Sequence, residues 1–398
     1  MKILVANLGS TSFKYRLYDL DDPSEPLLAQ GAVERIGSDS AKVIIRSPKG
    51  DAEMVQPVHD HGVAVQLCLE QLTSPDFGVI NTADDIAAIG FKAVHARQLS
   101  GVHQVDESLL EAMDAYSEVA PAHNPPYVKA MRMLQSRFPK LPLVAAFETG
   151  FHQTIPEAQS RYAVPDEWAT KYGIKRYGFH GASHRYIAGR MAELLGKSDA
   201  KIISCHLGGS SSLCAINAGK SVATSLGMSP QTGLPQNNRV GDFDVFALPA
   251  IMEEADLTLS EVLDTLATKS GLLGISGFND LRDIEKAAET GDAKATLALD
   301  MFIASIRHYL GAYLLELGGA DAIVFTGGIG ENSSRVRAGV CHDLGWFGIE
   351  MDWVKNVSGG GERTVSAPSS RVQLWCVPTN EEIVVARQSR DLLSGTGA

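Results

Sequence analysis

The sequence lacks the marks of several large protein classes. Its five cysteines are scattered with no C-x-x-C spacing, and aromatic residues make up 7% of its 398 residues. Such an odd, dispersed set is typical of reduced, buried thiols rather than of a disulfide framework, and it favours the cytoplasm. No apolar run approaches the roughly eighteen residues of a membrane-spanning helix. We therefore expect a globular, cytoplasmic protein with no membrane partner.

Positive charge is also scarce. The chain has 35 Lys and Arg against 47 Asp and Glu, a formal net charge of −12. Proteins that bind nucleic acid cluster Lys and Arg on one surface, so nucleic acid is not an expected partner. The common motifs G-x-x-x-x-G-K-[ST], G-x-G-x-x-G before a helix, and H-E-x-x-H are absent as well. An anionic substrate must therefore be held by a few local positive groups.

The sequence does contain an internal repeat. An apolar strand, a turn rich in Gly, Ser and Thr, and a second strand occupy residues 3–18, and the pattern returns at residues 202–216. A second pair of similar segments, residues 86–95 and 321–330, follows later in each half. Because 398 residues are too many for one ordinary core, we expect a duplicated α/β domain with a cleft between the copies.

Helices are expected between the strands. Asp106 is predicted to cap one helix, and Ser183 to cap another that Gly196 ends. The longest helix is expected from about residue 292 to residue 317. Residues 356–370 contain three consecutive glycines and indicate a surface loop.

Glycine-rich segments are the first candidates for binding. Where a strand ends in small residues, backbone N–H groups and hydroxyls can surround a phosphate. One Gly/Ser turn alone would more simply be a β-hairpin, but two at equivalent places favour a divided nucleotide site. Residues 325–332 add three glycines after a buried strand, and their polar residues are expected to start a helix. That bend would admit a flat ring or a phosphate, with a purely structural turn as the alternative.

Four basic side chains stand in unusual local settings. His180 lies between glycines and is as easily a satisfied loop residue as a catalytic one. His184 is expected on the first turn of a helix, in a structural role. His123 is held among three prolines, which fix the backbone but do not identify a function. Arg239 follows a polar loop, where an arginine is more often a solvated surface residue.

Together these segments resemble the acetate kinase family, the short-chain carboxylate kinases of the acetate and sugar kinase/Hsp70/actin superfamily. The resemblance runs from Lys2 to Arg387 and rests on the order and spacing of several blocks. The blocks are Asn7–Lys14, His123–Pro125, Arg176–His184, Cys205–Gly208, Gly233–Asp242, Ser276–Asp283, Phe325–Asn332 and Pro378–Glu382.

The resemblance implies a fold, a reaction and an assembly. The fold would be α/β, two duplicated ribonuclease-H-like (actin-like ATPase) domains with an interdomain cleft. The N-terminal domain would comprise residues 1–150 joined by the C-terminal helix 383–398, and the nucleotide-binding domain residues 151–382. The implied enzyme is a homodimer that uses Mg²⁺ (or Mn²⁺) and ATP/ADP to convert a small carboxylic acid to an acyl phosphate.

The resemblance also implies roles for individual residues. Arg239 and His180 would contact the transferring phosphoryl group, with His123 nearby; Asn7 and Glu381 would lie at the metal, where Glu148 replaces the family's aspartate. Nucleotide binding would fall to Ser10, Ser12, Lys14, His206, Gly208, Gly209, Asp280, Leu281, Arg282, Gly328, Ile329, Gly330 and Asn332. The acid would be bound by Lys92, Val94, Arg97, Ala122, Phe179 and Pro230.

The physical chemistry of the implied reaction suits these residue types. A carboxylate acceptor is already ionised at neutral pH, so no strong general base is required. The enzyme must instead align two anions and neutralise the oxygens of the phosphoryl group, which is work for Arg, His, a metal ion and backbone amides.

The departures from the family pattern cluster at the acyl end. Lys92 stands for an arginine and loses its bidentate fork, while Arg97 replaces a glycine and Ala122 a leucine. Glu148 is one methylene longer than aspartate, and Gly209 stands for a phosphate-contacting asparagine. Gln236-Asn237-Asn238 replaces Met-Gly-Thr. We hypothesise that a larger or more polar acid, such as propionate, butyrate or a hydroxy acid, is preferred to acetate; neutral drift is the alternative.

Two other function classes suit these residues less well. A member with a degraded site could bind nucleotide without transferring phosphate, but His180, Arg239, Asn7 and Glu381 are all present. A sugar kinase needs an aspartate that deprotonates a hydroxyl, whereas the matched blocks offer arginine and histidine at the acceptor.

Overall fold

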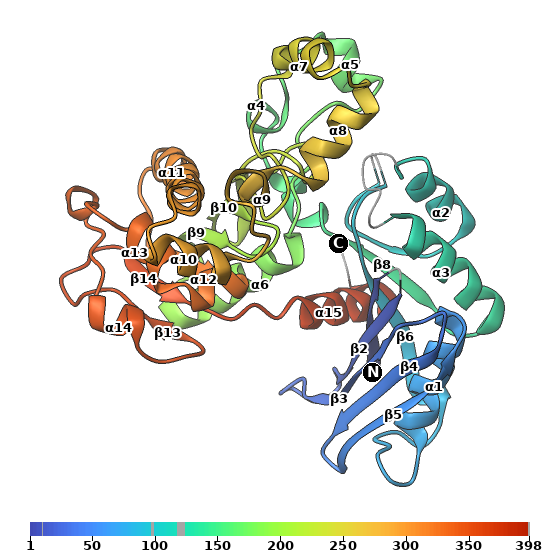
Figure 1. Cartoon of the computed structure of the whole chain (residues 1–398). Helices are drawn as coiled ribbons and strands as arrows, with labels where there is room; N and C mark the ends of the chain where they lie inside the picture. Colours follow the sequence, from blue (N-terminus) through green and yellow to red (C-terminus); the bar gives the residue numbers. More distant parts are fainter. Residues whose placement is uncertain (10, 97–98, 118–123, 397–398) are drawn as a thin grey trace. The chain divides into compact units, whose positions relative to one another are not determined.

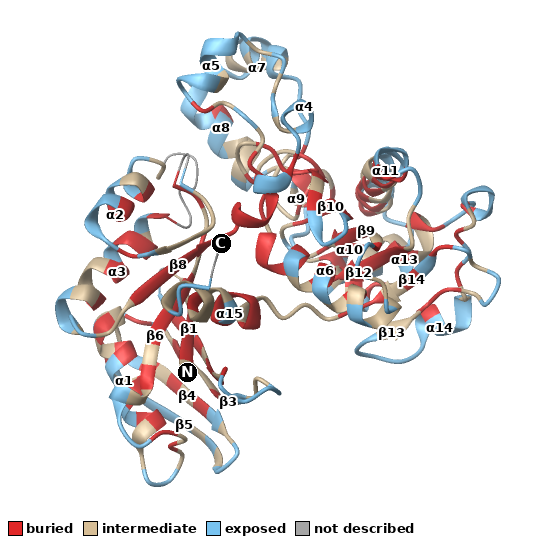
Figure 2. Ribbon diagram, turned by 180° about the vertical axis from the view of Figure 1, so that it is seen from behind, coloured by how far each residue is buried: buried red, intermediate tan, exposed pale blue. Residues whose placement is uncertain are grey.

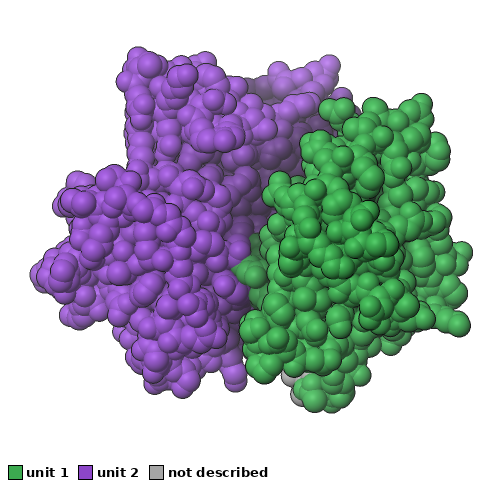
Figure 3. Space-filling model, turned by 90° about the horizontal axis from the view of Figure 1, so that it is seen from below, with its two compact units in different colours: residues 1–150, 380–398 green, residues 151–379 purple. Residues whose placement is uncertain are grey.

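The computed structural model of the chain describes residues 1–9, 11–96, 99–117 and 124–396. The predictions for Ser10, Arg97, Ala122 and His123 therefore lie outside the described residues. The chain divides into two compact units (Figures 1 and 3). Unit 1 comprises Met1–Gly150 and Asn380–Ala398, and unit 2 comprises Phe151–Thr379.

Unit 1 is built on an eight-stranded sheet of order β5-β4-β3-β2-β1-β6-β8-β7. At its centre β1 pairs antiparallel with β2 and parallel with β6, and β6 pairs parallel with β8. The apolar run that opens the sequence forms β1, where Ile3, Leu4 and Val5 are buried, as expected for a strand covered on both faces. The strands are β1 (Lys2–Gly9), β2 (Ser12–Asp19), β3 (Leu27–Glu34), β4 (Ser38–Ser47), β5 (Gly50–Val58), β6 (Ile86–Ala93), β7 (Val102–Gln104) and β8 (Leu143–Phe147).

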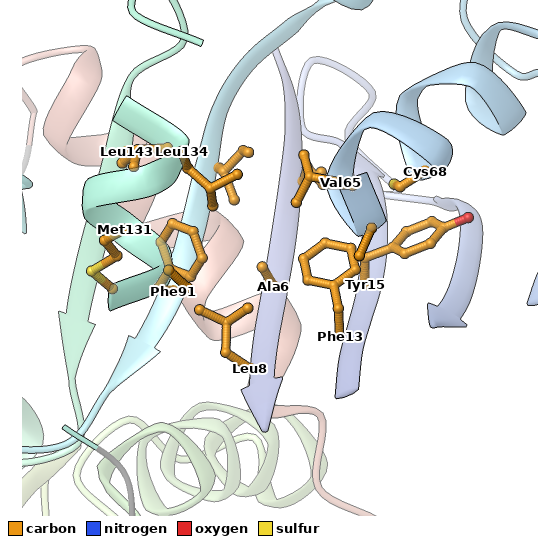
Figure 4. Close-up of a cluster of buried hydrophobic side chains, with 14 of the residues drawn as sticks. Ala6, Leu8, Phe13, Tyr15, Val65, Cys68, Phe91, Met131, Leu134 and Leu143 are labelled. Atoms are coloured by element: carbon orange, nitrogen blue, oxygen red, sulfur yellow. The ribbon is translucent and has the colours of Figure 1, made fainter. Parts of the chain in front are cut away.

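Helices cover both faces of this sheet. On one face α1 (His61–Thr73) and α3 (Asn124–Arg137) enclose a core to which alternate strand residues such as Phe13, Tyr15 and Phe91 contribute (Figure 4). Helix α2 (Glu107–Asp114) packs on α3. On the other face of the sheet, α15 (Glu381–Leu393) packs against β1, β6 and β8. Because strand side chains alternate, Phe91 enters the core and Lys92 lies on the face that carries α15.

Unit 2 repeats this plan on a six-stranded sheet of order β11-β10-β9-β12-β14-β13. Here β9 pairs antiparallel with β10 and parallel with β12, and β12 pairs parallel with β14. The order β3-β2-β1-β6-β8 of unit 1 thus returns as β11-β10-β9-β12-β14, which confirms the predicted duplication of an α/β domain. The strands are β9 (Lys201–His206), β10 (Ser212–Asn217), β11 (Lys220–Thr224), β12 (Ala322–Thr326), β13 (Arg363–Thr364) and β14 (Gln373–Cys376).

The second sheet is also covered on both faces. Ile202 packs with Ile187 and Met191 of α6 (Gly181–Leu195), whereas its neighbour Ile203 joins the cluster of α11 (Ala293–Glu316). The central strands of both sheets are accordingly buried (Figure 2). The other helices of unit 2 are α4 (Glu157–Ser160), α5 (Asp166–Thr170), α7 (Leu248–Ala255), α8 (Leu259–Thr268), α9 (Gly271–Ser276), α10 (Leu281–Glu289), α12 (Gly327–Asn332), α13 (Ser334–Val340) and α14 (Trp353–Val357).

Several local predictions are confirmed. Asp106 caps α2, as predicted, and the bounds of α11 are close to the predicted ones. Gly196 ends α6 in the left-handed conformation. The cysteines are all buried and free. In the part of the chain that the structure describes, no helix is both long enough and apolar enough to span a membrane.

Three local predictions are wrong. His180, not Ser183, is the N-cap of α6, because the left-handed backbone of His180 (φ 56°) turns the chain into the helix three residues earlier. Helix α12 begins at Gly327, so the glycines lie inside the helix rather than before it. Residues 356–370 are not all surface loop, since Asn356 is buried and Arg363–Thr364 pair with β14.

Candidate active site

In unit 1 the candidate residues gather where the parallel strands end. Lys92 lies near the end of β6, Glu148 directly follows β8, and Glu381 opens α15. Lys92 Nζ lies 2.5 Å from a carboxylate oxygen of Glu381 and 3.8 Å from one of Glu148. The strand ends of β6 and β8 and the first turn of α15 therefore bring three of the predicted residues into one charged cluster.

Electrostatics hold this cluster together. The Glu148 and Glu381 side chains are only 6% and 14% exposed, and that of Lys92 is 32% exposed. Burial disfavours the charged amine of Lys92, but the Glu381 and Glu148 carboxylates outweigh burial and raise the pKa of Lys92. The ammonium group is thus charged and bound to two protein carboxylates.

Asn7 lies beside a carboxylate that the sequence did not single out. Its Nδ2 donates to Glu382 Oε1 at 3.2 Å, and Arg16 Nη1 donates to the other oxygen of Glu382 at 2.9 Å. Neither Arg16 nor Glu382 was predicted to belong to the site. The available signal was the pair of acidic residues after Asn380, whose side chain caps α15. These contacts tie the end of β1 to the first turn of α15.

The oxygen donors of this region fit a hard cation only in part. Asn7 Oδ1 is buried and has no hydrogen-bond partner among the described residues, so an acceptor is available there. The described residues hold no group of three His, Cys, Asp or Glu side chains that could bind a metal alone. Mg²⁺ commonly binds through one or two carboxylates, water and the phosphates of a substrate. The residues therefore fit a metal that arrives with a nucleotide.

The remaining predicted residues of unit 1 lie on or beside the same strands. Gly9 pairs with Ser12 across the β1–β2 hairpin, and a Cβ on Gly9 would lie 2.5 Å from Ser12 Oγ, so a side chain there would require the Ser12 hydroxyl to move. Lys14 pairs with Asn7 in the register of β1 and β2, and both line a cavity of about 290 Å³. Val94 directly follows β6 and is half-buried.

In unit 2 most of the predicted nucleotide residues line one cavity. Its volume is about 670 Å³, which is within the usual range for a small-molecule site. Its lining includes the predicted Gly208, Gly209, Asp280, Leu281, Arg282, Gly328, Ile329 and Asn332, and also Asn237, Glu285 and Ser333, which were not predicted. Gly330 is buried outside the lining, where an added Cβ would lie 3.2 Å from the carbonyl carbon of Phe325.

One side of the cavity is formed by the first turn of α10. Asp280 caps this helix and accepts hydrogen bonds from the backbone N–H and the guanidinium of Arg282. The Arg282 bonds lower the pKa of Asp280 to about 2, so the carboxylate is ionised throughout the physiological range. The Arg282 side chain is 88% exposed, so its guanidinium can present its face to a bound molecule.

Two of the departures from the family pattern are neighbours. Asn237 N donates to Gly209 O at 3.1 Å, and Asn237 Nδ2 donates to Asn279 O at 2.8 Å. A Cβ added to Gly209 would lie 3.4 Å from Asn237 Nδ2. The family's asparagine amide is absent at position 209, and the amide of Asn237 lies next to that position on the adjacent loop.

Arg239 is held by its own loop. Its Nη1 donates to Ser210 Oγ and to Gln236 Oε1, both at 3.2 Å, and lies 3.5 Å from Pro230 O. Gln236 is fully buried and donates in turn to Pro230 O at 2.8 Å. Burial lowers the pKa of Arg239, but a guanidinium remains charged at any physiological pH. Gln236, a departure in the sequence, thus fixes the orientation of this cation.

His180 lies in a cluster of aromatic rings. Its ring stacks on that of His206, with centroids 4.3 Å apart, and His206 Nδ1 is 2.8 Å from Ser183 Oγ. The preceding Phe179 is buried, and its carbonyl accepts a hydrogen bond from the buried His152. A non-glycine residue with a left-handed backbone costs about 1–2 kcal/mol, so the surrounding contacts must hold His180 in place.

Comparison with known proteins gives consistent results over the whole chain. The sequence profile described as the Acetokinase family matches residues 2–387. Acetate kinase from Carboxydothermus hydrogenoformans is 44% identical over 397 residues, 99% of both chains. Acetate kinase from Halothermothrix orenii is 41% identical over 394 residues, 98% of both chains.

Solved structures agree with the sequence relatives. Porphyromonas gingivalis acetate kinase matches with a TM-score of 0.88 at 37% identity, covering 98% of this chain and 99% of that one. A propionate kinase from Francisella tularensis subsp. tularensis SCHU S4 matches with a TM-score of 0.88 at 32% identity, covering 97% and 98% of the two chains.

Proposed function

The chain belongs to the acetokinase family, and from this premise we propose that it is an acetate kinase-type phosphotransferase. It would move the γ-phosphoryl group of ATP reversibly to the carboxylate of acetate or a similar short-chain acid, giving an acyl phosphate and ADP. The observation that carries the nucleotide half of this proposal is the cavity of unit 2, where eight predicted residues meet.

The nucleotide would bind along this cavity. Gly208 and Gly209 follow β9 and carry no side chains, so phosphate oxygens can approach their backbone. Gly328 and Ile329 belong to the first turn of α12, where Gly328 leaves open space for a bound molecule, while the N–H of Ile329 is already bonded to Leu207 O. Asp280, Leu281 and Arg282 would hold the adenosine on the other side.

Arg239 and His180 would act on the phosphoryl group itself. A carboxylate oxygen of the acid attacks the γ-phosphorus, and the bond from this phosphorus to the β–γ bridging oxygen breaks in line. Negative charge on the equatorial oxygens is met by the guanidinium of Arg239, which Gln236 and Ser210 hold in one orientation. Because the acid is already a carboxylate, no proton has to be removed from it.

The metal would be bound by residues of unit 1, and the acid by residues of unit 1 together with Phe179 and Pro230 of unit 2. Asn7, Glu381 and Glu148 offer oxygen atoms to a divalent cation, Mg²⁺ or Mn²⁺, which would neutralise phosphate charge when bound. Lys92, Val94, Phe179 and Pro230 are proposed to contact the acid. The roles given to Ser10, Arg97, Ala122 and His123 stay predictions, as do the cytoplasmic location and the homodimer, which light scattering would test.

The proposed reaction is tested by trapping the acyl phosphate with hydroxylamine, using ATP and acids of two to six carbons with and without hydroxyl groups. We expect a signal with short acids, and Arg239→Ala should reduce it by roughly a thousandfold. The matched control is Arg190→Ala, which removes an arginine of α6 that pairs with Glu362. This variant should keep the signal.

Two outcomes would contradict parts of this proposal. If no acid yields a hydroxamate while ADP still binds, the protein is a nucleotide-binding member without transfer activity. If acetate has the highest kcat/KM, the hypothesis of a larger or more polar acid is wrong, although the kinase assignment stands.

A further inference from the structure

Two serine hydroxyls and two imidazole rings form a hydrogen-bonded row within unit 2. Ser204 Oγ on β9 is 2.9 Å from Nδ1 of His184, whose Nε2 is 2.9 Å from Ser212 Oγ on β10. Ser212 Oγ is in turn 2.8 Å from Nδ1 of His180. Ser204, His184 and Ser212 have no exposed surface, so water cannot substitute for any of these bonds.

The fold explains why these residues meet. Ser204 and Ser212 lie on the antiparallel strands β9 and β10, on the side of the sheet that α6 covers. His184 stands one turn into α6 and reaches both hydroxyls, whereas His180 precedes the helix and reaches only Ser212. In a buried row of this kind, the direction of one hydrogen bond determines the direction of the next.

The number of protons in the row is limited. A serine hydroxyl donates one hydrogen bond and can accept others. Burial, reinforced by His152 and His206, keeps the pKa of His184 well below its usual value, so this ring is neutral and carries one N–H. Ser212 can therefore donate its single proton either to His184 or to His180, but not to both.

The row therefore has two possible hydrogen-bond patterns, and its Ser204 end decides between them. In the first, Ser204 donates to His184 Nδ1, His184 Nε2–H donates to Ser212, and Ser212 donates to His180 Nδ1. In the second, every bond is reversed, and the buried Ser204 hydroxyl must find another acceptor. Within the described ranges of the chain, the ring of His184 is the one partner of that hydroxyl. The first pattern satisfies all the protons and is favoured.

We infer that Ser212 and His184 are positioning residues that keep the proton of His180 on Nε2, leaving Nδ1 as an acceptor. His180 then offers an N–H donor on Nε2. The catalytic consequence rests on the proposed function, in which this donor meets an oxygen of the transferring phosphoryl group. The tautomer itself rests only on the buried row and can be tested without turnover.

The tautomer is tested by long-range ¹H–¹⁵N correlation spectra of the full chain labelled with ¹⁵N-histidine, with the His180 signals assigned by their loss in His180→Gln. We expect Nδ1 of His180 to resonate as an unprotonated nitrogen and Nε2 as a protonated one. Ser212→Ala should give a mixture of both tautomers. Ser183→Ala, which removes a serine–histidine bond of the same cluster outside the row, should leave the His180 tautomer unchanged.

The positioning role is tested by kinetics. Ser212→Ala should lower kcat by roughly ten- to hundredfold with little change in KM, as found for groups that orient a functional histidine. Ser204→Ala, two groups away, should shift the tautomer in the same direction and lower kcat less, and it serves if Ser212→Ala fails to fold.

Three results would overturn the inference. They are a native His180 protonated on Nδ1, a tautomer that neither serine variant changes, and a changed tautomer with unaltered kcat. Loss of the proposed transferase activity in the native protein would leave the spectra interpretable, so the two proposals fail separately.

Discussion

At the scale of single residues, Lys92 departs most clearly from a simple substrate-binding role. Lys92 stands where the family pattern has an arginine, and it was expected to keep the positive charge beside a carboxylate substrate. The structure gives that charge two protein partners, Glu381 and Glu148, both less exposed than Lys92 itself. A ligand that binds this ammonium group must therefore compete with the Glu381 and Glu148 carboxylates. Substrate binding then depends on whether these ion pairs are formed.

Lys92→Met should accordingly destabilise the protein. Removing one partner of a buried ion pair leaves carboxylates without compensation, at a cost of about 3–5 kcal/mol when burial is complete. Because Lys92 is 32% exposed, solvent screening reduces the expected loss to about 1–2 kcal/mol. Urea unfolding at pH 7 measures it, and Lys197→Met, whose pair with Asp321 is more exposed, should change stability by less than about 0.5 kcal/mol.

The pH dependence of that difference follows from the direction of the pKa shift. The folded-state pKa of Lys92 is raised, so its stabilising contribution is complete below the unfolded-state pKa of about 10.4. It declines only as pH rises toward the folded-state value. The difference between native protein and Lys92→Met should thus be constant from pH 6 to 9. Equal losses for the Lys92 and Lys197 variants would contradict the buried cluster.

At the scale of elements, local patterns were sufficient for the central strands and for the helix cap at Asp106. The repeated apolar runs predicted β1 and β9 because a strand covered on both faces must be apolar along its length. Asp106 caps α2 by accepting a bond from the backbone N–H three residues on, a local contact that the sequence displays directly. The Ser183 prediction failed because the hydroxyl of Ser183 faces His206 and the left-handed His180 already starts α6.

The missed site residues share one property, which is that their partners are distant in sequence. Glu382 meets Asn7 only because α15 returns to the sheet of unit 1. Asn237 meets Gly209, and Ser212 meets His180, through loops and strands brought together by folding. Residue type and spacing cannot reveal such pairs in one sequence, so these contacts required the structure.

The proximity of Gly209 and Asn237 predicts mutual compensation. Gly209→Asn introduces a second amide where Asn237 already lies, and Asn237→Gly removes the amide that is there, so each change should weaken ADP binding by about tenfold. The double variant restores one amide in the alternative position and should return to within about threefold of the native Kd. Calorimetric titration with ADP measures the Kd of each variant. A double variant whose loss of affinity equals the sum of the two single losses would contradict this compensation.

At the scale of the whole molecule, one α/β plan serves twice with different results. Unit 1 uses the ends of β6 and β8 to gather Lys92 and Glu148 with Glu381, whereas unit 2 has a glycine-lined cavity beyond the ends of β9 and β12. The C-terminal helix α15 belongs to unit 1 although all of unit 2 precedes it in the chain. Both units must therefore fold before the full set of candidate residues exists.

The four tryptophans allow the nucleotide site to be assigned to one unit. Trp168, Trp346, Trp353 and Trp375 all belong to unit 2, so tryptophan fluorescence follows the unfolding of that unit. A ligand present at a hundred times its Kd stabilises the state that binds it by about 2.7 kcal/mol. ADP at that excess should therefore raise the midpoint of urea unfolding observed by fluorescence. Adding ADP to Gly328→Trp, which fills the cavity, should give no such shift. A fluorescence midpoint that ADP leaves unchanged in the native protein, despite measured binding, would mean that the nucleotide is held elsewhere.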